Sequence, residues 1–122
     1  MFSIIIPTYN NLAYLKLCLH SINKNSEHNH EILVHVNEGN DGTLKYLDNL
    51  KIRYTYSKKN AGVCYAFNEA AKLATKEYLV LGHDDMYFCP KWDTEFKYEL
   101  NKIGHKKFFL SGTMVQHFNG LI

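Results

Sequence analysis

The sequence has few cysteines, and they follow no pattern that would form a disulfide framework or a zinc site. Its 122 residues contain three, Cys18, Cys64 and Cys89, with no Cys-x-x-Cys pair. An odd number of widely spaced cysteines indicates a reducing compartment, so the cytoplasm is the expected location. Long hydrophobic runs are also missing. The run at residues 2–6 has no basic segment before it and ends at Pro7, which predicts a buried strand and not a signal peptide or a membrane span.

The sequence also lacks a large excess of positive or negative charge. Lys and Arg total 14 and Asp and Glu total 12, which gives a formal net charge of +2. So small and dispersed a charge does not favour nucleic-acid binding, and we expect no nucleic-acid partner. A hydrophobic content of 46% in a chain of this length suits a single globular domain over residues 1–122.

Three of the histidines lie close together in the sequence. His28, His30 and His35 have Glu27 and Glu31 nearby, a mixture that could suggest a metal centre. No cysteine joins them and their spacing matches no zinc motif, so a solvent-exposed loop is the preferred interpretation.

Short apolar runs alternate with segments of helical periodicity along the whole chain. The expected strands cover residues 2–6, 31–36, 52–56, 78–81 and 108–110. The expected helices cover residues 12–22, 43–50, 63–74 and 92–103. Asn10 or Asn11 can cap the first of these helices. The core-facing side chains expected in the third helix are Val63, Ala66, Phe67, Ala70, Ala71 and Ala74. This order predicts an α/β fold with a mainly parallel sheet flanked by helices.

Ligands of such sheets lie at the carboxyl ends of the strands, where four loops of this chain should meet. These loops are residues 7–10, 37–42, 60–62 and 83–85. Tyr9 offers an aromatic face for a base, Glu38 can accept hydrogen bonds from a base or ribose, and Gly62 lets a phosphate approach a helix N-terminus. Each could also serve only to form a turn. Neither Gly-x-Gly-x-x-Gly nor Gly-x-x-x-x-Gly-Lys-Ser/Thr occurs, so dinucleotide and P-loop sites are disfavoured.

Two adjacent carboxylates, Asp84 and Asp85, directly follow the apolar run at residues 78–81. Neighbouring carboxylates disfavour each other's ionised form unless a cation lies between them, and oxygen-only ligands favour Mg or Mn over zinc. Such an ion could bridge the pair to a diphosphate and stabilise it as a leaving group. The alternative is that the two residues only cap the segment that follows.

Four sequence motifs occur in a fixed order along the chain. They are residues 3–10, residues 36–43, Asn60-Ala61-Gly62 followed by Ala66, Asn68 and Glu77-Tyr78, and His83-Asp84-Asp85. In this order they resemble the motifs of the family 2 glycosyltransferases, which have the GT-A fold and use nucleotide-activated sugars. The resemblance covers essentially the whole chain and implies a Rossmann-like GT-A fold, with His83-Asp84-Asp85 at the place of the DXD motif. Gly82 departs from the pattern where a further acid is common, and Asn37 replaces the first acid of the second motif.

The resemblance also implies roles for the matched residues. Those implied to bind the nucleotide-sugar are Pro7, Thr8, Tyr9, Asn10, Glu38, Asn60, Gly62 and Asp84. Pro7, Thr8 and Tyr9 would line the nucleoside pocket, and Glu38 would contact the base. Asp84 would face the ribose or the sugar phosphate. Asp85 would ligate a Mn or Mg ion, with Asp84 as a second ligand.

The activity implied by the resemblance is a metal-dependent, inverting sugar transfer in the cytoplasm or at the periphery of a membrane. The donor would be a nucleotide-sugar, UDP-sugar by family default, and the acceptor a hydroxyl of a saccharide or a lipid-linked molecule. Family members continue with an acceptor-binding half that carries a catalytic carboxylate. No carboxylate follows Glu99 here, and His105 and His117 are expected to be structural or solvated. The resemblance therefore covers a truncated, nucleotide-binding half and identifies no catalytic base.

Two functions remain open at this point. One is a glycosyltransferase, either a piece of a longer enzyme or a chain completed by another. The other is a non-catalytic nucleotide-sugar-binding or assembly module. A nucleotidyltransferase is disfavoured, since no Gly-rich, basic phosphate loop follows the first strand. Residues 111–117 resemble the strand after the donor site, and the C-terminal apolar residues predict a homo-oligomer or completion by a further chain. Those apolar residues are Phe108, Phe109, Met114, Val115, Phe118, Leu121 and Ile122.

Overall fold

The computed structural model describes residues 1–113 and confirms the α/β prediction. Its strands are β1 (Phe2–Tyr9), β2 (Glu31–Asn37), β3 (Arg53–Ser57) and β4 (Tyr78–Leu81). Its helices are α1 (Leu12–Asn25), α2 (Thr43–Asn49), α3 (Val63–Ala71) and α4 (Trp92–Lys102). The described strands form one sheet in the order β3-β2-β1-β4, and every neighbouring pair is parallel. No helix in this part of the chain is both long and apolar enough to span a membrane.

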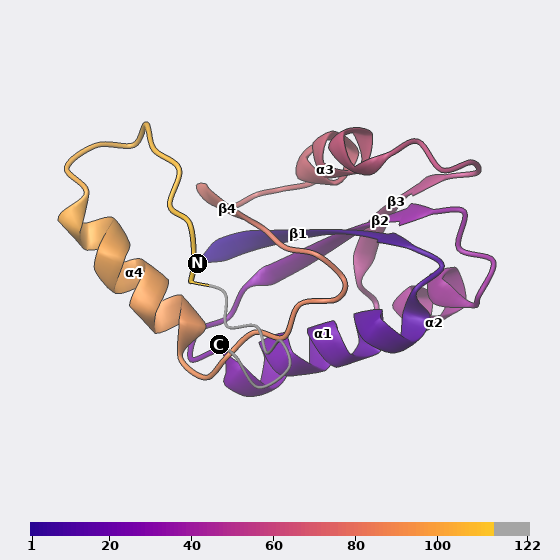
Figure 1. The fold of residues 1–122 in the computed structure, drawn as a ribbon, viewed down its shortest axis with the longest axis horizontal. Coiled ribbons are helices and arrows are strands. Elements are labelled where there is room, and N and C mark those ends of the chain that lie inside the picture. Colours follow the sequence, from indigo (N-terminus) through magenta and orange to yellow (C-terminus); the bar gives the residue numbers. More distant parts are fainter. Residues whose placement is uncertain (114–122) are drawn as a thin grey trace, which may run out of the picture.

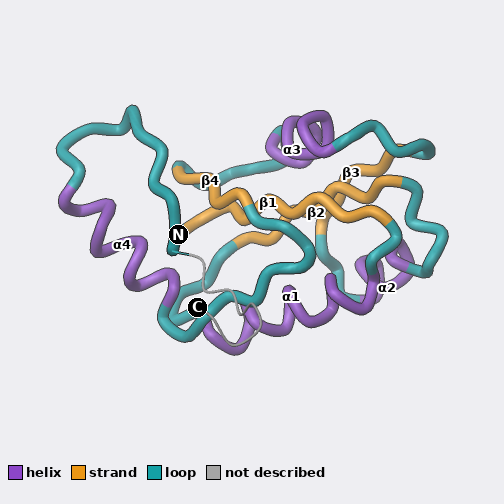
Figure 2. Tube along the Cα trace, in the orientation of Figure 1, coloured by secondary structure: helices purple, strands orange, loops and turns teal. Residues whose placement is uncertain are grey.

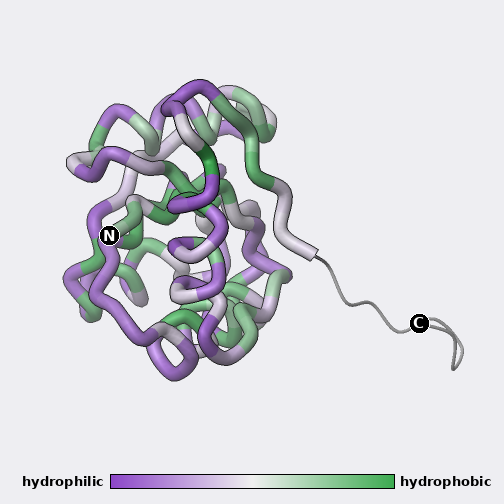
Figure 3. Tube along the Cα trace, turned by 90° about the vertical axis from the view of Figure 1, so that its left-hand side faces the viewer, coloured by the Kyte–Doolittle hydropathy of each residue, from purple (hydrophilic) through white to green (hydrophobic). Residues whose placement is uncertain are grey.

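Helices cover both faces of the sheet. Figures 1 and 2 show α1 and α2 on one face and α3 on the other, with α4 beside the end where β1 begins. On the α1 face, Ile4 and Ile6 of β1 belong to the same core cluster as Leu15 of α1. On the α3 face, Ile5 and Leu33 pack with Ala70. Hydrophobic and hydrophilic segments alternate along the chain (Figure 3), as expected where strands are buried and the connecting loops are exposed.

Strand β1 is the centre of the sheet and runs past the end of β4. It pairs with β2 from Ser3 to Tyr9, but with β4 only from Phe2 to Ile5. The sequence predicted that Pro7 would end this strand. Because backbone groups alternate in direction along a strand, the missing N–H of Pro7 faces the same side as the Ile5 carbonyl, which bonds the Gly82 N–H beyond β4. Pro7 therefore removes no hydrogen bond of the sheet.

The fifth predicted strand, residues 108–110, is wrong. These residues and residues 111–113 form no strand in the described structure, and Phe109 is 98% exposed. A strand needs a hydrogen-bonded neighbour, whereas Phe108 instead packs its ring against Tyr78 and His105. Residues 114–117 of the strand predicted after the donor site, His117 and the remaining apolar residues proposed for self-association lie outside the described residues, so self-association stays a prediction.

Helix α3 is shorter than predicted and its first residue faces solvent. After Ala71 the N–H groups of Lys72, Leu73 and Ala74 bond carbonyls three residues back, so the last turns tighten and the α-helix ends. Val63, predicted to face the core, is 49% exposed. It begins the helix at the carboxyl ends of the strands, where the sheet no longer covers it.

The prediction that His30 and His35 lie in a solvent-exposed loop is also wrong. The His35 side chain is buried on β2, with Nδ1 2.7 Å from Thr55 Oγ1 and Nε2 2.9 Å from Ser57 Oγ. Burial lowers the pKa of His35, and the opposing effects of Asn37 and Glu69 do not offset it. These contacts give His35 a structural role inside the sheet.

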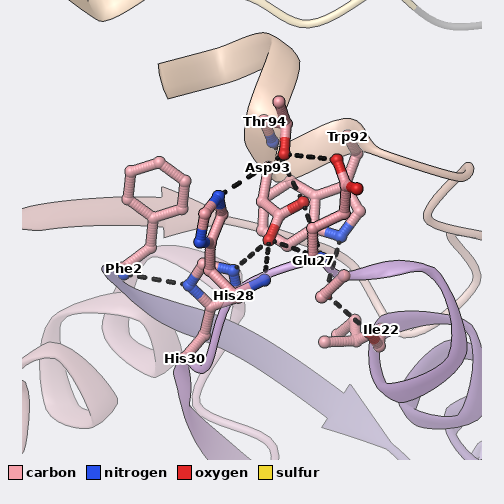
Figure 4. Close-up of polar contacts among 9 residues, drawn as sticks. Phe2, Ile22, Glu27, His28, His30, Trp92, Asp93 and Thr94 are labelled. Atoms are coloured by element: carbon pink, nitrogen blue, oxygen red, sulfur yellow. Dashed lines mark hydrogen bonds and ion pairs between the residues drawn. The ribbon is translucent and has the colours of Figure 1, made fainter. Parts of the chain in front are cut away.

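His30 belongs to a buried polar cluster with Asp93, shown in Figure 4. The Phe2 N–H donates to His30 Nδ1 at 3.1 Å, and His30 Nε2 lies 2.9 Å from Asp93 Oδ2. Nδ1 is thus an acceptor, so Nε2 carries the proton and donates to the carboxylate. Asp93 also accepts the N–H groups of Glu27 and His28. The cluster joins the start of α4 to the connection between α1 and β2.

A second carboxylate, Glu31, joins the amino ends of β1, β2 and β4. It accepts hydrogen bonds from the hydroxyl of Ser3 and from both the N–H and the hydroxyl of Thr75. Burial raises the pKa of Glu31, but these hydrogen bonds outweigh it and lower the pKa from 4.5 to about 2. The ionised form is therefore the one that the folded state stabilises.

We expect Glu31 to make the stability depend on acid pH. Its folded pKa is depressed, so its contribution is complete above about pH 4.5 and is lost as the pH falls toward 2. Replacing Glu31 with glutamine should lower the free energy of unfolding at neutral pH by about 2 kcal/mol. Urea unfolding at several pH values measures this. A Glu31→Gln protein that lost stability between pH 4.5 and 2 as steeply as the wild type would contradict the assignment.

Candidate functional site

The carboxyl ends of three strands lie level at one edge of the sheet. Tyr9 of β1 pairs with Asn37 of β2, which pairs with Ser57 of β3. Strand β4 ends earlier, because Leu81 pairs with Ile5. The segment after β4 therefore lies beside the free end of β1.

The structure brings Asp84 to Thr8 at this place. Thr8 is 3% exposed, and its hydroxyl donates to Asp84 Oδ2 at 2.8 Å. The segment after β4, which carries Asp84, is tied to β1 at its first residue, because the Gly82 N–H donates to the Ile5 carbonyl at 2.9 Å. The other oxygen of Asp84 and both oxygens of the exposed Asp85 accept no hydrogen bond within residues 1–113. Three carboxylate oxygens are thus available at the sheet edge.

The two carboxylates fit a Mn or Mg ion in their chemistry. The described residues contain no group of three or more His, Cys, Asp or Glu that could hold a metal. Mg-type ions, however, are usually bound through one or two carboxylates, with waters and substrate phosphates as the other ligands. Asp84 and Asp85 satisfy that requirement, whereas a structural zinc site would need four protein ligands, mostly Cys and His, and the described residues contain no such group.

Cys18 of α1 lies beneath this segment. Its thiol is fully buried and lies 3.5 Å from the His83 carbonyl oxygen. Burial raises the pKa of Cys18, and the negative charges of Asp84 and Asp85 raise it further, to about 12. The thiol therefore stays neutral, and its contact shows that α1 supports the segment that carries both carboxylates.

Glu38 and Asn60 meet on the other side of β1. The Asn60 N–H donates to Glu38 Oε2 at 3.2 Å, and the Asn40 side-chain amide lies 3.4 Å from Glu38 Oε1. Asn37 is buried, and its Oδ1 accepts the Ala61 N–H at 3.1 Å. These contacts join the loop after β2 to the loop before α3, so Glu38 has a structural partner as well as a place in the predicted site.

Gly62 lies at the N-terminus of α3 with open space beside it. Its N–H donates to Asn60 Oδ1 at 3.0 Å, and a Cβ atom added at Gly62 would meet nothing within 4 Å. A ligand can therefore approach the backbone of this helix start.

The remaining predicted site residues lie along the end of β1. Pro7 is buried beside His35 of β2, Tyr9 is 49% exposed, and Asn10 accepts the Asn40 N–H through Oδ1 at 2.8 Å. The end of β1 thus separates two groups, Thr8 with Asp84 and Asp85, and Asn10 with Glu38, Asn60 and Gly62. No described hydrogen bond joins these two groups directly.

Asp41 is a structural residue of this edge that the sequence did not reveal. Its Oδ2 accepts the Leu12 N–H at 2.9 Å, and its Oδ1 accepts the Thr43 hydroxyl at 2.6 Å. Asp41 therefore caps the start of α1 as well as α2, whereas Asn11 makes no side-chain cap and Asn10 bonds elsewhere. Burial raises the pKa of Asp41, but the hydrogen bonds of Thr43 and Leu12 lower it overall. Asp is a common residue just before a helix, so the contact with Thr43 has a local signal, but the contact with Leu12, 29 residues away in the sequence, has none.

Two small cavities lie away from this edge. Their volumes are about 140 and 160 Å³, and both are lined by His28 and His30 near the amino end of β2. Ligand pockets for small molecules are usually larger, roughly 300 Å³ or more. The open sheet edge with its free carboxylates is therefore the stronger candidate site.

Known proteins similar to this chain point to a single family. The model of the family "Glycosyl transferase family 2" matches residues 3–113. An uncharacterized glycosyltransferase of Rickettsia conorii is 37% identical over 118 residues, which cover 90% of this chain and 19% of the relative. The uncharacterized glycosyltransferase YfnE of Bacillus subtilis is 33% identical over 89 residues, covering 69% of this chain and 23% of the relative. The chain thus spans about a fifth of the length of these relatives.

Solved structures show the same fold. TarS of S. aureus in complex with UDP matches with a TM-score of 0.73 at 23% identity, over 83% of this chain and 32% of that one. The mannosyltransferase PcManGT of Pyrobaculum calidifontis, in complex with GDP-Man and Mn²⁺, matches with a TM-score of 0.67 at 23% identity. That match covers 77% of this chain and 30% of the other. With the family match across residues 3–113, these findings show that the chain belongs to glycosyl transferase family 2.

Proposed function

We propose that this chain binds a nucleotide-sugar donor, in the first place a UDP-sugar, together with a Mn or Mg ion, as the donor side of an inverting glycosyltransferase. The observation that carries the proposal is the contact between Thr8 and Asp84 at the free end of β1, with Asp85 exposed beside it. Support comes from TarS and PcManGT, whose structures have this fold and hold UDP and GDP-Man with Mn²⁺ respectively.

Thr8 and the two carboxylates would form the metal side of the site. The Thr8 hydroxyl donates a hydrogen bond to Oδ2 of Asp84, so it orients that carboxylate and leaves Oδ1 for the ion or the donor. Asp85 would be the main ligand. A bound divalent ion supplies Lewis-acid stabilisation of a departing diphosphate.

Tyr9, Asn10 and Glu38 would form the nucleoside side. The exposed ring of Tyr9 offers a stacking surface, while Glu38 Oε1 and Oε2 offer acceptors to an imide or ribose group. Gly62 leaves the α3 N-terminus open, where partial positive charge suits phosphate. The acceptor would be a hydroxyl of a saccharide or a lipid-linked molecule, in the cytoplasm or at a membrane surface.

The proposal predicts metal-dependent binding of UDP that depends on Asp85. In calorimetric titrations of the full chain, UDP should bind at least tenfold more tightly with Mn²⁺ than with EDTA, because Asp85 and Asp84 would hold the ion and the ion would attract the diphosphate. Asp85→Ala should remove this difference. Asp48→Ala, which changes an exposed carboxylate on α2, is the matched control and should keep it. Mn-dependent UDP binding that survived Asp85→Ala would refute the metal assignment.

Donor binding without sugar transfer is the second candidate. It is favoured by the described sheet edge itself: besides Asp84 and Asp85, its carboxylates are Glu38 and Asp41, and both are held by backbone N–H groups of neighbouring segments, whereas an inverting transfer needs a positioned general base. Incubating the chain with UDP-sugars and measuring UDP release separates the two, because turnover eliminates the binding-only function.

A further inference from the structure

The loop that carries Asp84 and Asp85, residues 82–91, lies along helix α1. Figure 1 shows the segment between β4 and α4 doubling back over this helix. The loop begins at Gly82, which bonds Ile5, and it ends where the Lys91 N–H donates to the Asn25 carbonyl at 3.0 Å. Both ends are thus tied to other elements, and α1 supplies the support between them.

Three polar side chains of α1 form that support. Cys18, Ser21 and Asn25 are spaced by three and four residues, so they share one face of the helix, and each is less than 9% exposed. A buried polar side chain is costly unless it has a hydrogen-bond partner. Here each has a partner in the loop: Cys18 contacts the His83 carbonyl, and Ser21 and Asn25 bond Phe88. The Ser21 hydroxyl also donates to the Cys18 carbonyl of its own helix at 2.6 Å, which leaves its oxygen aimed at the loop as an acceptor.

Phe88 is the anchor of the loop. Its N–H donates to Ser21 Oγ at 2.9 Å, and its carbonyl accepts from Asn25 Nδ2 at 2.7 Å. Its ring packs against Trp92 at a centroid distance of 4.9 Å and fills the space beside Gly82, where an added Cβ would lie 3.4 Å from Phe88 Cζ. Side chains of α1 therefore hold both backbone groups of one loop residue.

The two carboxylates lie between these anchor points. Residues 84–87 are bracketed by the His83 contact with Cys18 and by Phe88, and the Met86 N–H closes a turn on the His83 carbonyl at 3.2 Å. The hydrogen bond from Thr8 to Asp84 is their direct side-chain tie to the sheet. The position of the loop on α1 thus determines where Asp84 and Asp85 lie relative to Thr8.

We propose that Ser21 and Asn25 are positioning residues that hold Asp84 and Asp85 in the geometry needed to bind the metal ion. This inference rests on the function proposed above. Neither residue touches the ion or the donor. Both act through Phe88, from the carboxyl-terminal half of the helix face that supports the loop.

The test compares UDP binding with and without Mn²⁺ in Ser21→Ala and Asn25→Ala variants of the full chain. Loss of a residue that orients metal ligands typically costs tenfold or more in metal affinity, so the ratio of the two UDP affinities should fall about tenfold. Binding in EDTA should stay unchanged, because Tyr9 belongs to β1 and Glu38 lies beyond β1, so neither depends on the loop for its place. Ser21→Thr keeps the hydroxyl and should restore much of the ratio.

A core variant controls for stability. Leu47→Val changes a buried side chain of α2 that takes no part in the site, and it should lower thermal stability while leaving the Mn²⁺ ratio at the wild-type value. Hydrogen exchange of the amides at residues 84–88 should be faster in Ser21→Ala and not in Leu47→Val. Two destabilised α1 variants with a wild-type ratio and wild-type exchange would overturn the positioning role. A wild-type chain that binds UDP equally with and without Mn²⁺ would instead overturn the proposed function, and this inference with it.

Discussion

Replacing Asp93 with asparagine should lower the free energy of unfolding by about 3 kcal/mol, a large fraction of the stability of a domain of this size. Asparagine keeps the shape of the side chain but exchanges one carboxylate oxygen for an NH₂ group. Asp93 Oδ1 accepts the N–H groups of Glu27 and Thr94, and Oδ2 accepts those of Glu27, His28 and His30. In either orientation the new donor would face donors, in a site that is fully buried.

Thermal and urea unfolding measure this effect. The melting temperature should fall by roughly 10 °C. Asp48→Asn is the control, because Asp48 is an exposed carboxylate that accepts one hydrogen bond from the Tyr54 hydroxyl. It should cost less than about 1 kcal/mol. Equal losses of unfolding free energy in Asp93→Asn and Asp48→Asn would show that the buried cluster stabilises the fold no more than an exposed carboxylate does.

The effect of Asp93→Asn should also depend on pH. Burial raises the pKa of Asp93, but the hydrogen bonds from His30 and from the Glu27, His28 and Thr94 N–H groups lower it below the usual value of 3.8. The stabilisation by the ionised form is therefore complete above that value and is lost as the pH falls through the folded pKa. The gap between wild type and variant should narrow in acid. A gap that widened below pH 3.8 would contradict the assignment.

Gly39→Ala should be the second large change, at about 3 kcal/mol, because strain and a steric clash add. Gly39 has φ +69°, and an added Cβ would lie 2.7 Å from Val36 Cγ1 and 3.3 Å from Leu44 Cγ. Val36 is fully buried, so it has little room to move. The strain would be relieved by a shift of the turn that carries Glu38, so UDP affinity should fall as well.

Gly42→Ala separates strain from clash. Gly42 has φ +90°, but its added Cβ would meet only Leu12 Cδ2 at an ordinary 3.9 Å. This variant should lose about 1 kcal/mol, the cost of the backbone conformation alone. Chemical unfolding of both variants gives the comparison. A Gly39→Ala protein as stable as Gly42→Ala would show that the contact with Val36 relaxes without cost.

Much of the fold and of the site edge could be predicted from local patterns. The β-branched run at Ile4 and Ile5 predicted a strand buried on both faces, and parallel strands place their carboxyl ends together. Thr8 and Asp84 were therefore expected at one edge although 76 residues separate them. The family motifs pointed to the same loops.

Other features needed the tertiary structure. His30 and Asp93 are 63 residues apart, and no local pattern indicates that the two side chains meet in a buried cluster. The apolar run at residues 108–110 has strand propensity but no strand neighbour, so it forms no strand within the described residues. The capping of α1 by Asp41 also needed the tertiary structure, since Asp41 and the Leu12 N–H that it accepts are 29 residues apart in the sequence.

By itself, the sequence determined the order of the elements from β1 to α4, most of the buried apolar positions and the loops that meet at the sheet edge, because these follow from side-chain periodicity and strand direction. Only the tertiary structure decided which polar groups satisfy one another: Thr8 with Asp84, Asp93 with His30, and Ser21 and Asn25 with Phe88. The physical reason is that a hydrogen bond needs a partner at about 3 Å in the right direction, and that is a property of packed elements and not of spacing along the chain.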